Sequence, residues 1–360
     1  MTIVGSATSA GTRRFSARSV CPAGHFRRVG DQFWSSVGIG TYLGAVNEIT
    51  DRLVEFAVID AVAGGINVID TAANYRREQA EKSIGRSLEK LISRGQVNRD
   101  ELIICSKGGY LPFGAEGFRQ DVSGKVGNVT EDDMVGGSHC MHPDYLEWQL
   151  NRSLENLGID TLDVYYVHNP EAQAGKITPD LFERRLEQAF RMLEGAVLDG
   201  KIRAYGIATW NAFRLPVGQT AYMSLQNAKS IALCAADGDR DNFRFIQMPI
   251  HLAALEGLQL ANQTVGADQF PAVRAALNLG IRTIASSAIG QAKLTELPEH
   301  LGKVLGDDLS DVQRALQFTR SAPGIATALV GMKQPDHVLH NLELCQIPPL
   351  PAARVRTLYA

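Results

Sequence analysis

The sequence predicts an α/β protein: one (β/α)8 TIM barrel in a single domain, with a long loop after the third strand and an irregular N-terminal leader. Short β-branched runs alternate with longer segments of helical period, which is typical of βαβ units around a parallel sheet. Eight such runs follow one another without an intervening linker. The length of 360 residues would also allow two domains with an open doubly wound sheet, but the unbroken alternation favours one barrel.

The elements can be placed along the chain from these runs. The eight strands are expected to begin near Val37, Ile66, Glu101, Thr161, Ile202, Phe243, Ile281 and Ile325. Helices are expected at 51–63, around 84–92, and at 143–157, 179–199, 269–278, 309–320 and 335–342. Several of them end at a glycine, which easily adopts the left-handed conformation after a last helical turn. Helix ends therefore explain part of the glycine content.

Two segments lie outside the alternation. Residues 1–36 are polar and basic, and we expect a leader with a possible hairpin that closes the floor of a barrel domain spanning 37–360. Residues 108–142 contain eight glycines and show no helical period. A loop that follows a barrel strand lies on the C-terminal face, where barrel active sites form. We therefore expect the 108–142 loop to cover a substrate pocket.

Composition excludes several classes of function. The net charge of -3 lacks the basic excess of a nucleic-acid-binding protein. No stretch approaches the roughly 20 apolar residues of a membrane span, and the first residues lack the pattern of a signal peptide. The five cysteines are widely spaced without a CxxC motif, as is typical of reduced thiols. We expect a cytoplasmic protein with a small-molecule partner and no nucleic-acid or membrane partner; the oligomeric state stays open.

Four polar residues stand at or just after the ends of three neighbouring strands. Asp70 ends the second strand and Tyr75 follows it in the loop, while Lys107 ends the third strand and His168 the fourth. Each alone has a structural explanation, such as a helix cap or a surface cation. Together they are expected to converge on the mouth of the barrel.

Such a set can deliver a proton to a carbonyl group. A free tyrosine has a pKa near 10, about three units above neutrality, which is too high for efficient acid–base work. A neighbouring lysine ammonium lowers that pKa, and a paired aspartate keeps a buried lysine charged. A neutral histidine can donate to the carbonyl oxygen and orient it. Because no activated nucleophile is visible, reduction of this carbonyl requires a hydride from a cofactor.

From Val37 to Asn341 the chain resembles the aldo-keto reductase superfamily. The most specific stretch is GGINVIDTAANYRREQAEKSIGRSL (64–88), and GIGTY, IICSKGG, VHNPE, GKIRAYGIAT and ALVGMKQPDHVLHN are similar to further blocks in the same order. The resemblance implies a barrel that binds NAD(P)(H) across its mouth without a Rossmann domain. It also implies oxidoreductase activity that interconverts a carbonyl (an aldehyde, ketone or sugar) and an alcohol.

The resemblance assigns the catalytic tetrad to Asp70, Tyr75, Lys107 and His168. In this assignment Tyr75 protonates the carbonyl oxygen as the hydride arrives, and accepts the proton of the alcohol in the reverse direction. The chemistry of proton transfer and the family pattern therefore point to the same four residues.

The resemblance also implies residues that contact the nicotinamide. Gln247 fits the glutamine that holds the amide group, and Asn169 can assist it. Where the family has Ser-Asn, this chain has Ala208 and Thr209, so Thr209 is expected to supply the remaining contact. Ser286 stands where the family commonly places a stacking aromatic.

The adenosine half of the cofactor is expected near the last helix. His337 occupies the position of a family arginine that binds the 2′-phosphate, and Lys333 lies four residues earlier, at a helix start that suits phosphate. Asn341 fits the residue that contacts adenine. These residues favour NADP(H) and do not exclude NAD(H).

Three aromatic residues are candidates for the substrate pocket: Tyr42, Trp210 and Tyr110. Three potential metal ligands gather in the long loop: His139, Cys140 and His142. Their spacing is poor for tetrahedral zinc, and no metal is expected.

Two other functions fit part of these observations. Lys107 could act in a Schiff-base aldolase, although that chemistry requires a neutral lysine and Asp70 should keep this one charged. The chain could also be a cofactor-binding regulatory subunit with little turnover, as are the channel β subunits that resemble this superfamily. The physiological substrate and the preferred direction stay open.

Overall fold

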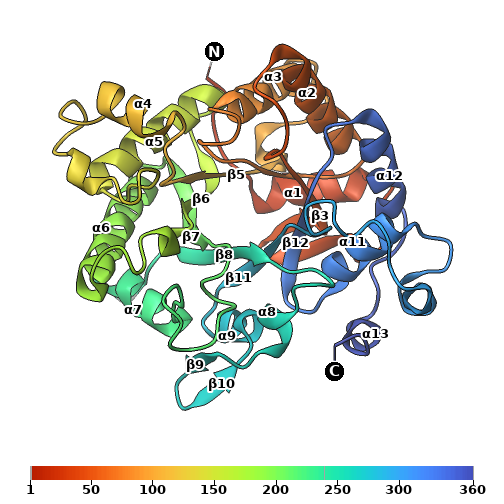
Figure 1. Cartoon of the computed structure of the whole chain (residues 1–360). Helices are drawn as coiled ribbons and strands as arrows, with labels where there is room; N and C mark the ends of the chain where they lie inside the picture. Colours follow the sequence, from red (N-terminus) through yellow and green to blue (C-terminus); the bar gives the residue numbers. More distant parts are fainter. Residues whose placement is uncertain (1, 239, 360) are drawn as a thin grey trace.

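A computed structural model describes residues 2–238 and 240–359, and its eight parallel strands close into a barrel surrounded by helices (Figure 1). The strands pair in the order β11-β12-β3-β4-β5-β6-β7-β8, and β8 pairs with β11. They are β3 (Val37–Gly40), β4 (Val68–Asp70), β5 (Ile103–Gly108), β6 (Leu162–His168), β7 (Ile202–Ala208), β8 (Phe243–Pro249), β11 (Arg282–Ser286) and β12 (Ile325–Gly331). The predicted barrel is confirmed, and each strand begins within two residues of its expected start.

One helix of the outer ring follows each barrel strand. These helices are α2 (Glu48–Ala63), α3 (Gln79–Ser93), α5 (Pro143–Leu157), α6 (Pro179–Leu198), α7 (Leu225–Ala235), α9 (Ala272–Asn278), α11 (Asp311–Ser321) and α12 (Pro335–Cys345). The sequence did not predict α7, because three of its four buried residues are alanines and its hydrophobic period is weak. The expected start of α9 was also wrong. Residues before Pro271 form a hairpin of β9 (Gln263–Val265) and β10 (Asp268–Phe270).

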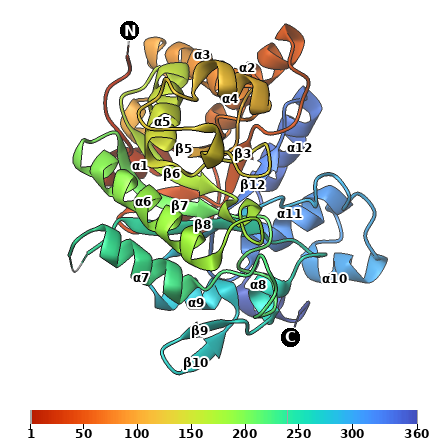
Figure 2. The ribbon, with the colours of Figure 1, turned by 60° about the vertical axis from the view of Figure 1, so that its left-hand side comes forward.

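Short elements decorate the barrel, and most of them lie in its loops (Figure 2). They are α4 (Gly114–Asp121), α8 (Glu256–Gln259), α10 (Gly302–Leu305), α13 (Ala352–Arg356), η1 (Arg99–Glu101), η2 (Glu131–Asp133), η3 (Pro170–Ala172) and η4 (Glu299–Leu301). Among the described residues, none of the helices combines the length and the apolar character that a bilayer crossing requires.

The leader is more regular than the sequence indicated, and it lies at the N-terminal ends of the strands. Its residues form α1 (Ser9–Arg18) and an antiparallel hairpin of β1 (Phe26–Val29) and β2 (Gln32–Ser35). Trp34 of the hairpin stacks on Phe245 of β8 with ring centroids 5.2 Å apart, inside the barrel core. The side chain of Asn67, just before β4, accepts from the Ser35 N–H and donates to the Phe33 carbonyl. The leader thus packs against the floor of the barrel.

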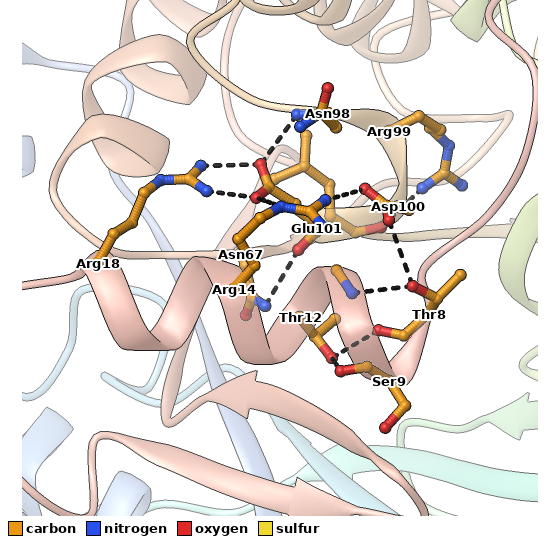
Figure 3. Close-up of polar contacts among 12 residues, drawn as sticks. Thr8, Ser9, Thr12, Arg14, Arg18, Asn67, Asn98, Arg99, Asp100 and Glu101 are labelled. Carbon is orange, nitrogen blue, oxygen red and sulfur yellow. Dashed lines mark hydrogen bonds and ion pairs between the residues drawn. The ribbon is translucent and has the colours of Figure 1, made fainter.

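Polar contacts hold α1 on the barrel, which explains why an apolar period did not reveal this helix (Figure 3). Arg14 donates to Glu101 at 2.9 Å and to Asp100 at 2.6 Å. Arg18 donates to the second oxygen of Glu101 at 2.8 Å, and the Asn98 N–H donates to the same oxygen at 2.9 Å. The Glu101 side chain is fully buried. Burial raises the pKa of Glu101, but the hydrogen bonds from Arg18, Asn98 and Arg14 outweigh it and hold the pKa below its usual range.

We expect Glu101→Gln to lower the free energy of unfolding by about 1–3 kcal/mol at neutral pH, because a buried acceptor of charged donors is lost. A carboxyl with a depressed pKa stabilises the fold above its unfolded-state pKa of 4.5. That stabilisation is lost as the pH falls through the lower folded-state value. The difference between the variant and the native chain should therefore shrink in acid. Urea denaturation at several pH values measures it. Glu131→Gln, in an exposed pair with Arg119, is the control and should cost less than about 1 kcal/mol.

Candidate functional site

A cavity of about 710 Å³ opens at the C-terminal ends of the barrel strands. Each barrel strand, or the loop that follows the strand, contributes residues to the lining of the cavity. Among the lining residues are Tyr42, Tyr75, Tyr110, Asn169, Trp210, Gln247, Gln291 and Lys333. Most of the polar residues predicted from the sequence therefore share one chamber. This face is where barrel enzymes carry their chemistry.

Asp70 and Lys107 form a buried ion pair beneath the cavity. The Lys107 Nζ lies 2.5 Å from Asp70 Oδ1 and donates to the Thr71 carbonyl at 2.8 Å. Gln247 Nε2 donates to the second Asp70 oxygen at 2.8 Å. Strand register brings the two together, because β4 and β5 pair side by side, with Asp70 opposite Cys105 and Lys107 two residues further along β5. Asp70 lines the cavity, whereas Lys107 lies behind it.

Tyr75 lies between this ion pair and His168. The Lys107 Nζ is 5.0 Å from the centroid of the Tyr75 ring. The imidazole of His168 meets the same ring edge-on at 5.9 Å, and Tyr42 packs against it at 5.0 Å. The structure thus brings together all four residues that the sequence placed at the mouth.

The charge states follow from burial and from the ion pair. Burial lowers the pKa of Lys107, but the Asp70 carboxylate and Tyr75 outweigh it, so the pKa of Lys107 is raised and the amine stays charged. Burial raises the pKa of Tyr75, and Lys107 opposes that rise without cancelling it. Burial and Lys107 lower the pKa of His168 well below its usual value, which leaves a neutral imidazole. The phenol is therefore a protonated donor beside a neutral histidine at physiological pH.

The backbone after Tyr75 is strained and is held by two ion pairs. Arg76, Arg77 and Glu78 have φ angles of +50°, +52° and +67°, the left-handed region that non-glycine residues rarely adopt. Buried Arg76 pairs with Asp51 of α2. Buried Glu78 accepts two hydrogen bonds from Arg152 of α5, at 2.7 and 2.6 Å. These contacts to two neighbouring helices fix the turn that carries the tyrosine.

The expected cofactor residues divide into two groups. Six of them line the cavity: Asn169, Thr209, Gln247, Ser286, Lys333 and His337. The seventh, Asn341, is buried in α12 and does not line it. Lys333 lines the cavity from the loop just before the N-terminus of α12. Amide and hydroxyl groups across the mouth, with a cation at one loop, fit an elongated anionic nucleotide.

Thr209 is hydrogen-bonded to Glu171, a residue that the sequence did not indicate. Its hydroxyl donates to Glu171 at 2.6 Å and accepts from the Ala212 N–H at 2.8 Å. The same Glu171 oxygen accepts from the Trp210 N–H at 2.8 Å, so this carboxylate anchors the loop after β7. With its proton committed, the Thr209 hydroxyl can only accept a further hydrogen bond. Glu171 stands three residues after His168, which is the one signal that could have pointed to it.

The 108–142 loop does not cover the pocket as expected. Within 109–142, Tyr110 is the one described residue that lines the cavity. The rest of the loop builds a small core of its own against Tyr145 and Trp148 of α5, from Leu111, Phe118, Val122, Val129 and Cys140. It also contains α4, whose short amphipathic turn the glycines concealed. The loop after β11, residues 286–292, lines the cavity instead. Its residues Ser287, Gln291 and Ala292 adopt positive φ angles.

Comparison with known proteins agrees with this architecture. A sequence profile of the Aldo/keto reductase family matches residues 36–235. Aldose reductase B of Dictyostelium discoideum is 25% identical over 50% of this chain and 51% of its own length. The NADH-specific methylglyoxal reductase of Escherichia coli (strain K12) is 27% identical over 49% of each chain. The chain thus spans about half the length of these curated relatives.

Solved structures share the whole fold. An aldo/keto reductase from Klebsiella pneumoniae in complex with NADP and acetate superposes with a TM-score of 0.62, at 19% identity, over 93% of this chain and 94% of that one. At this identity the likeness shows the fold alone. The family profile, however, covers more than half of the chain. The chain therefore belongs to the aldo/keto reductase family of oxidoreductases.

Proposed function

We propose that the chain interconverts a small carbonyl compound and its alcohol, with Tyr75 as the general acid and base and NADP(H) as the hydride carrier. The observation that carries the proposal is the position of Tyr75, which faces the cavity between a charged Lys107 and a neutral His168. The nicotinamide supplies the hydride when it is bound. The amide nitrogen of Gln247 donates a hydrogen bond to Asp70, so its carbonyl oxygen stays available to accept one from the carboxamide of the nicotinamide.

The residues of the chain divide the remaining work. In reduction, the protonated phenol of Tyr75 donates to the developing alkoxide, and the neutral imidazole of His168 orients the carbonyl oxygen. Lys107 stabilises the phenolate that remains. In oxidation, the phenolate of Tyr75 takes the proton of the alcohol. Tyr42, Tyr110 and Trp210 line the cavity beside these groups and are the proposed substrate contacts.

A Schiff-base aldolase is a poorer fit to the same site. The Lys107 amine is charged, paired with Asp70 and absent from the cavity lining, so it offers no free lone pair to a carbonyl group in the cavity. A regulatory subunit would bind the same cofactor without turnover, and activity measurements distinguish it from an enzyme.

The proposal is tested by fluorescence titration with NADPH and NADH, followed by a panel of aldehydes, ketones and sugars assayed with the tighter cofactor. We expect saturable binding of NADPH and turnover of at least one carbonyl compound. Binding without turnover across the panel would favour the regulatory subunit. Absence of binding of either nucleotide by the folded chain would contradict the proposed function.

Lys333 is the proposed contact to the 2′-phosphate, and this supports NADP(H) over NAD(H). We expect Lys333→Ala to weaken NADPH binding about tenfold, the loss of one charged hydrogen bond, and to leave NADH binding unchanged. Paired titrations measure both constants. Lys125→Ala, on the exposed surface of the 108–142 loop, is the matched control for loss of one positive charge. Equal weakening of both nucleotides by Lys333→Ala would place the 2′-phosphate elsewhere.

A further inference from the structure

His139 is the point at which the 108–142 loop reaches His168. Its side chain is fully buried, and its Nε2 lies 2.7 Å from the carbonyl oxygen of His168. On the other side, its Nδ1 lies 3.1 Å from Nε2 of Gln173, which is also fully buried. His139 does not line the cavity, so it can act on the site only through the lining residues that it contacts, and its hydrogen bond is to His168.

The hydrogen-bond pattern fixes which nitrogen of His139 carries the proton. Arg185 of α6 donates to Oε1 of Gln173 at 3.2 Å, so the amide of Gln173 presents its Nε2 to His139. An amide nitrogen only donates, and Nδ1 of His139 must therefore accept. The proton is on Nε2, from which it is donated to the His168 carbonyl. Burial lowers the pKa of His139 to about 4, so this neutral tautomer persists near neutrality.

The carbonyl to which His139 donates immediately precedes a residue in the left-handed region. His168 ends β6, and the next residue, Asn169, has a φ of +46°. The Asn169 N–H donates to the Ala208 carbonyl at 2.6 Å. The peptide between His168 and Asn169 is thus hydrogen-bonded at both ends: its N–H to β7 and its carbonyl to His139. The two residues that this peptide joins, His168 and Asn169, both line the cavity.

The local sequence makes room for this contact. Gly109 has a φ of +125°, and a Cβ there would lie 2.8 Å from Nε2 of His139. The Gly109 carbonyl accepts from the Cys140 N–H at 2.8 Å, which draws residues 139–140 alongside the end of β5. The ring of Tyr110 then packs edge-on against His139 and against His168, each at 5.1 Å. A side chain at position 109 would push the imidazole away from the His168 carbonyl.

We propose that His139 is a positioning residue for the carbonyl–alcohol reaction: its N–H holds the His168 carbonyl, so that the His168 imidazole keeps its orientation toward Tyr75. The inference rests on the proposed function, since it requires His168 to orient the substrate. It also assigns a role to the 108–142 loop. Through His139 the loop holds the backbone of His168, and it does not cover the opening of the cavity.

Three variants test the inference by steady-state kinetics per folded protein, with melting temperatures measured in parallel. His139→Leu removes the donor, and we expect kcat to fall about ten- to a hundredfold, since small displacements of a catalytic group cost that much. His139→Gln places an amide N–H near the position of Nε2, and should restore most of kcat. Val129→Ala, in the core of the loop and away from the cavity, should lower the melting temperature without lowering kcat. The affinity for NADPH is followed by fluorescence.

Several outcomes would overturn the inference. One is a His139→Leu variant that folds and keeps the native kcat; another is a Val129→Ala variant that loses as much kcat as His139→Leu. If His139→Leu fails to fold, His139→Gln and His139→Asn decide, because asparagine is too short to reach the carbonyl. Recovery by glutamine alone supports the inference, and equal kcat in both contradicts it. Tyr75→Phe, measured alongside, tests the proposed function separately, so that the two failures are distinguishable.

Discussion

Replacing Tyr75 with phenylalanine is expected to reduce kcat by about 10²–10⁴-fold while NADPH binding stays close to native. The magnitude is that of a lost general acid in the transition state. The ring remains, so its edge contacts with Tyr42 and His168 and its place over Lys107 persist. Both members of the Asp70–Lys107 ion pair also remain in the variant. The loss should therefore fall on the chemical step.

The measurement is single-turnover reduction at saturating NADPH, with the fluorescence titration on the same sample. Tyr42→Phe is the matched control, because it removes a phenol oxygen from the same cavity without removing the proposed proton donor. We expect that control to change KM more than kcat. A Tyr75→Phe variant with the native rate would exclude tyrosine as the acid.

Replacing Lys107 with methionine is expected to have the second largest effect, on activity and on stability together. Removal of the ammonium leaves Asp70 buried without its counter-charge, which costs roughly 3–5 kcal/mol of unfolding free energy. The double variant Asp70→Asn with Lys107→Met removes both charges. It should regain part of that stability and none of the activity. Urea denaturation and kcat of the two variants separate the structural role of the pair from its chemical one.

The pH dependence of Lys107→Met follows from the charges around Tyr75. Burial raises the pKa of Tyr75 and Lys107 opposes the rise, so loss of the lysine raises that pKa further. Alcohol oxidation requires the phenolate, and its rate should therefore rise only at higher pH than in the native chain. Carbonyl reduction requires the protonated phenol and should keep a flat profile near neutrality. A downward shift of the oxidation profile in the variant would contradict the assigned role of Lys107.

The barrel and the four residues at its mouth were predictable for one physical reason. Buried parallel strands read as short apolar runs, and the residue at the end of each run is placed on the same face by the register of the sheet. Asp70, Lys107 and His168 are such residues. Tyr75 lies beyond the strand, in a turn whose left-handed residues no propensity would suggest. The sequence places Tyr75 in the loop just after the second strand, and the resemblance to a family block selects the same residue.

The features that the sequence did not disclose depend on contacts between distant segments. The α7 helix buries alanines, whose small side chains give little periodic signal. The α1 helix is held by Glu101, 83 residues away from its partner Arg18. Glu171 accepts hydrogen bonds from Thr209 and from the Trp210 N–H, 38 and 39 residues away, and His139 contacts the His168 carbonyl, 29 residues away. A polar contact of this kind leaves no pattern in the neighbouring residues.

The leader and the cavity lie at opposite ends of the barrel, and this separation bears on how the protein can be altered. The N-terminal ends of the strands are consolidated by α1, Trp34 and Asn67, whereas the loops after the C-terminal ends line the chamber. A library of variants confined to Tyr42, Tyr110 and Trp210 would sample new substrates and would leave the contacts at the N-terminal end of the barrel unchanged. Tethering the chain to a surface through its first residues would likewise leave the chamber open to solution.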